Sequence, residues 1–147
     1  MPSDQISPHF AYDEMTRTNT GLANVPSIAQ EADLVRLCEL ILEPLRALVG
    51  PLYVNSGFRS PEVNHAIGGA LNSQHMRGQA ADLKPVNLTL DDAFHGARAS
   101  SIPFDQLILE PTWLHVSVAP LGSLPRRQCL RAHMGDQGRM VYEADHG

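Results

Sequence analysis

The sequence predicts one domain of mixed α-helical and β-strand structure, because two hydrophobic periodicities occur in one short chain. Apolar residues recur at helical spacing between residues 28 and 49, whereas apolar and polar residues alternate between residues 113 and 118, as in a half-buried strand. With 147 residues, 43% of them hydrophobic, the chain can bury one core but hardly two. We expect a single domain over residues 1–147, with its core at about 9–120 and a C-terminal tail at 121–147 whose role the sequence does not define.

The longest predicted helix begins at Ser27, which forms a capping box with Gln30. It runs to about Val49 and should kink at Pro44, because proline has no N–H to donate and its ring clashes with the preceding turn. Its apolar positions are Ile28, Val35, Cys38, Ile41, Leu42, Leu45 and Leu48.

Two shorter helices and four strands complete the prediction. The helices should begin at the N-caps Ser60 and Thr89, and Pro61 occupies the first helical position, which proline favours. The strands are expected at residues 52–56, 79–83, 104–109 and 113–118.

Two of these strands carry polar side chains that should share one face of a sheet. Alternate residues of a strand point to the same side, so Asp82 shares a face with Ala80, and His115 shares a face with Trp113. Asp82 and His115 could then lie together on one face, with His75 reaching in from the preceding loop.

These three side chains form a candidate metal site. Zinc accepts nitrogen and oxygen donors, and a hydrolytic zinc site leaves its fourth position to water, so His75, Asp82 and His115 are a suitable ligand set. The seven-residue offset from His75 to Asp82 is interrupted by Gly78, which argues against a helical His-x-x-x-His pair. A lone histidine is more often a structural, hydrogen-bonded residue. The metal interpretation therefore depends on the three residues occurring together.

Three segments carry a resemblance to a known family. They are Ser56-Gly57-Phe58-Arg59-Ser60-Pro61, Ser73-x-His75-x-x-Gly78-x-Ala80-x-Asp82 and Trp113-x-His115. In these segments the chain resembles the zinc D-alanyl-D-alanine peptidases, which include carboxypeptidases of the VanX and VanY kind and several phage endolysins. The resemblance extends from about residue 9 to residue 118. It implies an α+β fold of the hedgehog/D,D-peptidase type, a small antiparallel sheet with flanking helices, and one zinc held by His75, Asp82 and His115.

The resemblance also implies roles for an arginine and for an acidic residue. Arg59 matches the family arginine that binds substrate or stabilises the transition state. Members of the carboxypeptidase branch carry the general base three residues before the last histidine ligand, where this chain has Thr112. Glu110 is the nearest acid, and a turn at Pro111 could fold it back toward the metal. We therefore assign Glu110 as the base, with Asp105 as the alternative.

Ser73, Gln74 and Trp113 are further candidates for substrate binding. Ser73 and Gln74 precede the first histidine ligand and could contact substrate or orient His75 by hydrogen bonding. Trp113 could form a wall of the cleft, although a plain packing role explains an aromatic residue equally well.

Composition argues against several classes of function. The net charge of −5, with no tract rich in lysine or arginine, disfavours nucleic acid as the main partner. No apolar stretch approaches the roughly 20 residues of a membrane span. Residues 1–5 lack the basic start and apolar run of a secretory signal. Without such a signal, Cys38 and Cys129 are more often free thiols than a disulfide.

The function expected from these observations is zinc-dependent hydrolysis of amide bonds in peptidoglycan stem peptides or cross-links, by a D-Ala-D-Ala carboxypeptidase or an endolysin-type endopeptidase. The partners are then peptidoglycan peptides, the cofactor is one Zn²⁺ per chain, and a monomer is favoured. The protein would be made in the cytoplasm and reach the wall after release or delivery by another component. The alternative is a non-catalytic, zinc-containing module that binds the wall or forms part of a phage structure, which the absence of an acid at Thr112 favours.

Overall fold

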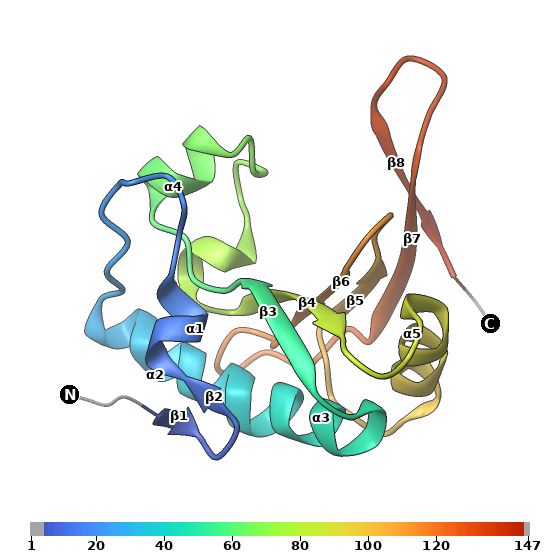
Figure 1. The fold of residues 1–147 in the computed structure, drawn as a ribbon, viewed down its shortest axis with the longest axis horizontal. Coiled ribbons are helices and arrows are strands. Elements are labelled where there is room, and N and C mark those ends of the chain that lie inside the picture. Colours follow the sequence, from blue (N-terminus) through green and yellow to red (C-terminus); the bar gives the residue numbers. More distant parts are fainter. Residues whose placement is uncertain (1–4, 146–147) are drawn as a thin grey trace.

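The computed structural model describes residues 5–145 and has a six-stranded sheet at its centre (Figure 1). Most of the N-terminal segment considered above for a secretory signal lies outside the described residues. The strand order is β3-β4-β6-β5-β7-β8. The strands are β3 Leu52–Ser56, β4 Ala80–Pro85, β5 Gln106–Leu109, β6 Leu114–Ser117, β7 Gln128–Met134 and β8 Met140–Ala144. This mixed architecture confirms the predicted α+β class.

One face of this sheet packs on the hydrophobic core, and the other carries the candidate site. The remaining elements are β1 Gln5–Ser7, β2 Phe10–Ala11, α1 Tyr12–Thr16, α2 Ile28–Leu37, α3 Glu43–Val49, α4 Pro61–Ala66, a 3-10 turn at Gln74–Arg77 and α5 Leu90–Ala99. Leu83 of β4, Leu114 of β6 and Phe94 of α5 are fully buried in one hydrophobic core. The neighbouring strand residues Asp82 and His115 therefore point to the opposite face.

The long helical segment forms where predicted, with one irregular turn. The side chain of Ser27 accepts a hydrogen bond from the N–H of Gln30, and the Gln30 side chain accepts one from the N–H of Ser27, which confirms the capping box. A π-helical turn at Cys38–Leu42 separates α2 from α3, and Pro44 lies in the first turn of α3. The irregularity is thus a widened turn just before the proline, where the regular hydrogen-bond pattern is already interrupted.

The predicted apolar positions of this segment are only partly buried. Ile28 is 87% exposed, because it lies in the first turn of α2, six residues before Leu34, the first buried residue of that helix. Leu48 is 50% exposed and Val35 is 37% exposed. The π turn contains an extra residue and rotates the face that follows it. Leu45 is buried as predicted, and Val49 reaches the core in place of Leu48.

The C-terminal segment is part of the sheet and not a loose tail. β7 pairs with β5 in parallel, with Leu130 opposite Ile108, and β8 pairs with β7 as an antiparallel hairpin. The sheet is therefore mixed, whereas we expected an antiparallel sheet that ended near residue 118. The hairpin is mostly exposed, so its sequence lacks the apolar alternation that identifies a strand.

The shorter helices begin at the predicted caps: Ser60 accepts a hydrogen bond from the N–H of Val63, and Thr89 accepts one from the N–H of Asp92.

Cys38 and Cys129 are both free thiols, and burial raises the pKa of Cys38 to about 12. Within residues 5–145, the helices are too short or too polar to span a bilayer.

Candidate active site

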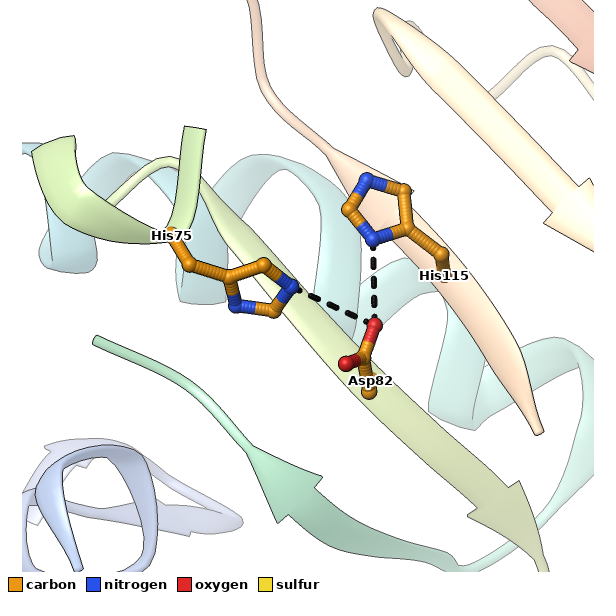
Figure 2. A group of neighbouring side chains, drawn as sticks. All are labelled: His75, Asp82 and His115. Atoms are coloured by element: carbon orange, nitrogen blue, oxygen red, sulfur yellow. Dashed lines mark hydrogen bonds and ion pairs between the residues drawn. The ribbon is translucent and has the colours of Figure 1, made fainter. Parts of the chain in front are cut away.

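Two adjacent strands and one short turn bring the three predicted ligands together. Asp82 of β4 and His115 of β6 are direct partners in the antiparallel pairing, so their side chains lie side by side on the exposed face of the sheet. His75 lies in the 3-10 turn, whose N-cap Ser73 accepts a hydrogen bond from the N–H of His75. Figure 2 shows both imidazole rings directed at the Asp82 carboxylate.

The distances among these side chains fit a shared metal ion. His75 Nε2 lies 3.3 Å and His115 Nδ1 lies 3.0 Å from Asp82 Oδ1, and one ligand atom from each residue lies within 4.8 Å of the others. Two ligands bound about 2.0 Å from a tetrahedral zinc are about 3.3 Å apart, so the observed spacing is close to that of a zinc shell.

The protonation of His75 supports the same conclusion. Its Nδ1 lies 2.7 Å from the carbonyl oxygen of Gly57, which can only accept, so Nδ1 carries the proton and Nε2 has a free lone pair. Nε2 is buried and has no hydrogen-bond partner within residues 5–145. It faces a carboxylate oxygen, and two lone pairs in contact are unfavourable unless a cation lies between them. The residues present therefore fit a divalent metal, and the nitrogen and oxygen donors suit zinc.

The ionisation of the ligands is also suitable. Burial lowers the pKa of His75, so the ring stays neutral and can bind a metal. Burial alone would raise the pKa of Asp82, but the facing His75 and His115 rings hold it well below its usual range. Asp82 is thus a carboxylate at neutral pH, as metal coordination requires.

Arg59 belongs to this cluster through Asp82. Its Nη2 donates to Asp82 Oδ2 at 2.9 Å, its Nε donates to Ser56 Oγ at 3.0 Å, and its Nη1 donates to Asn64 Oδ1 at 3.3 Å. Three of the five N–H groups of the guanidinium are thereby used within the protein. Arg59 also lines the cleft, but its observed contacts hold a metal ligand in place.

The turn after β5 places Glu110 in the same cleft. The N–H of Glu110 donates to the carbonyl of Trp113 at 2.9 Å, so Pro111 and Thr112 form the tight connection between β5 and β6. Glu110 is 8% exposed and lines the cleft together with the three ligands. Burial raises the pKa of Glu110, and this increase is opposed by His115 and reinforced by Asp82.

Comparison with known proteins agrees with this geometry. A family model described as Peptidase M15 matches residues 8–117, which include the three ligands, Arg59 and Glu110. The chain belongs to the Peptidase M15 family. It is also 38% identical over 87 residues to a protein of Streptomyces albus G described as a zinc D-Ala-D-Ala carboxypeptidase, an alignment that covers 56% of this chain. The chain spans about a third of that relative's length, 34%.

Asp105, the alternative candidate for the general base, accepts hydrogen bonds from two other residues. Its carboxylate accepts from the Nε, the Nη2 and the backbone N–H of Arg126, at 2.7 to 3.0 Å, and from Gln74 Nε2 at 3.3 Å. The hydrogen bonds from Arg126 lower the pKa of Asp105. A carboxylate in these surroundings is a poor proton acceptor, so the geometry favours Glu110 as the base.

The three candidates for substrate binding all line the cleft: Ser73, Gln74 and Trp113. Ser73 caps the turn that carries His75, and Gln74 donates to the carbonyl of Val118 at 3.2 Å as well as to Asp105. Both residues therefore shape the ligand loop, as the orienting interpretation expects.

Several residues in or next to the site lie outside the sequence predictions. Gly57 belongs to the motif at Ser56–Pro61, but nothing in the sequence indicates that its carbonyl oxygen contacts His75. Asn64 contacts Arg59 from α4. Leu130 and Tyr142 line the cleft from β7 and β8, beyond the residues that the M15 model matches.

Proposed function

We propose that this M15 chain is a zinc-dependent peptidase that hydrolyses amide bonds in peptidoglycan stem peptides or cross-links. The observation that carries the proposal is the convergence of His75, Asp82 and His115 in a cleft that Glu110 also lines. The description of the Streptomyces albus G relative as a zinc D-Ala-D-Ala carboxypeptidase supports both the metal and the substrate class.

One zinc per chain would be held by His75, Asp82 and His115. When bound, zinc supplies Lewis-acid polarisation of a scissile carbonyl and eases the ionisation of water at neutral pH. His75 contributes a neutral nitrogen that Gly57 orients, and Asp82 contributes a carboxylate that Arg59 orients.

Glu110 would act as the general base and then as the general acid. It is buried, and its raised pKa brings it closer to neutral pH, where proton transfer in both directions is efficient. It would accept the proton of the attacking water and return it to the leaving amine. The two N–H groups of Arg59 that the protein does not use could donate to the substrate carboxylate or to the developing oxyanion.

The partners would be peptidoglycan peptides, and the protein would act on the wall after release or delivery by another component. We propose a monomer, because the three ligands, Arg59 and Glu110 already form a complete site within one chain.

Incubation of the purified protein with muropeptides, followed by mass spectrometry of the products, tests the proposal. Hydrolysis should stop on treatment with a chelator and return on addition of zinc. Full activity in a chelator-treated sample would contradict a metal-dependent mechanism. A protein that retains zinc but releases no product would instead support the binding-module alternative.

A further inference from the structure

The sheet face that carries the metal ligands continues past them for three more strands. Asp82 pairs with His115, His115 with Ile108, and Ile108 with Leu130, so these four side chains form one row across β4, β6, β5 and β7. Residues in register on adjacent strands share a face. Ile108 and Leu130 therefore continue the floor of the cleft that begins at the metal ligands, and both line it.

The last hairpin adds an aromatic residue to this floor. Tyr142 of β8 pairs with Ala132 of β7, which lies two residues beyond Leu130 and so on the same face. Tyr142 lines the cleft and is half-exposed toward it. Its phenol can donate and accept hydrogen bonds. Figure 1 shows β7 and β8 standing at the end of the sheet farthest from β3.

Polar groups border this apolar floor. Gln106 of β5 donates to Gln128 of β7 at 2.7 Å, and both side chains line the cleft two residues before Ile108 and Leu130. Amide side chains in this position can donate to and accept from the backbone of a bound peptide. An apolar lining with a few polar groups beside it is the usual composition of a ligand-binding site.

The length of the added surface is sufficient for several residues of substrate. Three strand spacings separate β6 from β8, which is about 14 Å at 4.8 Å per spacing, and an extended peptide of about four residues covers that distance. The whole cleft measures about 1030 Å³, at the upper end of the roughly 300–1,000 Å³ of small-molecule sites. The cleft can therefore contact residues of the peptide beyond the two that flank the scissile bond.

We propose that Leu130 and Tyr142 of the C-terminal hairpin form a subsite for residues remote from the scissile bond, so that this peptidase prefers longer peptides to short ones. The ligand is a peptide that runs across β5, β7 and β8 and places an apolar side chain over Ile108 and Leu130. This inference rests on the proposed peptidase function. It adds a determinant of substrate length that lies outside the matched residues 8–117.

The test compares Tyr142→Ala and Leu130→Ala with the control Val141→Ala. Val141 is on the same strand as Tyr142 but points to the opposite face, and it is 38% exposed. The substrates are a short stem peptide that ends next to the scissile bond and two longer peptides, extended by four residues on one side or the other. Loss of one apolar contact in a binding pocket costs about tenfold in kcat/KM.

We expect kcat/KM to fall about tenfold for one of the longer peptides in both cleft variants. It should be unchanged for the short peptide and in Val141→Ala. Tyr142→Phe keeps the ring and should lose less than Tyr142→Ala. Equal losses on short and long peptides, or no loss at all, would overturn the subsite. Thermal unfolding of each variant shows whether its hairpin is still folded. If the hairpin is lost in Tyr142→Ala, the comparison is made with Tyr142→Phe, which removes only one oxygen atom.

Calorimetric measurement of the affinity for the product peptides, which the protein does not cleave further, separates this inference from the proposed function. If the wild type hydrolyses nothing but binds the longer product more tightly than Tyr142→Ala does, the subsite stands and the peptidase proposal fails. If hydrolysis is normal and product binding is the same in both proteins, the subsite is wrong and the peptidase proposal stands. A wild type that neither binds nor hydrolyses these peptides contradicts both.

Discussion

Replacement of Arg59 by lysine should weaken zinc binding as well as hydrolysis. The guanidinium donates at once to Asp82 at 2.9 Å, to Ser56 at 3.0 Å and to Asn64 at 3.3 Å, and the side chain is only 12% exposed. A lysine ammonium is a single point of charge and cannot keep this planar, three-way arrangement. The carboxylate of Asp82 would then lose the partner that fixes its orientation toward the two histidines.

The expected loss can be estimated from the contacts. Removal of a group that orients a metal ligand typically weakens metal binding by about 10- to 100-fold, which corresponds to about 1.4–2.7 kcal/mol. The metal-free protein should also be less stable, because a hydrogen bond to a buried charged group contributes about 1.5–3 kcal/mol. Both effects are specific to the contact with Asp82, so they should be absent in a variant of another arginine in the same cleft.

Competition between the protein and a coloured zinc chelator measures the affinity, and Arg77→Lys is the matched control. Arg77 lines the same cleft, but its Nε donates to Gln79 and not to a ligand. Arg59→Lys should lose zinc to the chelator at a lower chelator concentration than the wild type and Arg77→Lys. If Arg59→Lys binds zinc with wild-type affinity but hydrolyses poorly, Arg59 acts directly on substrate and the orienting role is wrong.

Three further outcomes are expected. His75→Ala and His115→Ala should each lose stoichiometric zinc, as metal analysis would show, and full occupancy in either variant contradicts the ligand assignment. Glu110→Gln should retain zinc while hydrolysis of muropeptides falls by roughly 10²–10⁴-fold, and unchanged turnover would place the base elsewhere. Asp105→Asn should leave hydrolysis nearly intact but reduce the free energy of unfolding at pH 7 by about 2 kcal/mol, because the buried carboxylate loses its charge-assisted bonds to Arg126. Since the pKa of Asp105 is lowered in the folded protein, its contribution is complete above the unfolded pKa of about 3.9 and disappears as pH falls through the folded pKa. Denaturation at pH 7 and at low pH should therefore show a difference between wild type and variant that shrinks on acidification.

The position of the metal ligands was predictable because it depends on short-range rules. Strand alternation has a period of two, so Asp82 and His115 had to share a face once β4 and β6 paired in register. The turn at Pro111 likewise had only a few residues in which to bring Glu110 back, and the structure places it in the cleft. Local sequence was sufficient in both cases.

The role of Arg59 and the C-terminal hairpin depend on contacts that local sequence does not encode. Arg59 reaches Asp82 because Ser56, at the end of β3, pairs with Asp82 after an irregularity in the strand register. That pairing joins segments that are 26 residues apart. The hairpin is recognisable only from its parallel pairing with β5, since all of its residues are at least partly exposed and none belongs to the buried core. Tyr142 could not be assigned to the cleft before that pairing was known.

Two glycines of the site show why the N-terminal elements also belong to it. Gly78 has a φ of 76°, and a Cβ there would lie 2.5 Å from the carbonyl oxygen of Gln30 in α2. A Cβ on Gly57 would lie 2.5 Å from the carbonyl oxygen of Met15 in α1. Any larger residue would push the loops that hold His75 away from these helices, because backbone atoms at such distances cannot yield as a flexible side chain can. The first turn of α2 and the end of α1 therefore help to fix the position of His75 above the sheet, although both elements precede the first ligand by many residues.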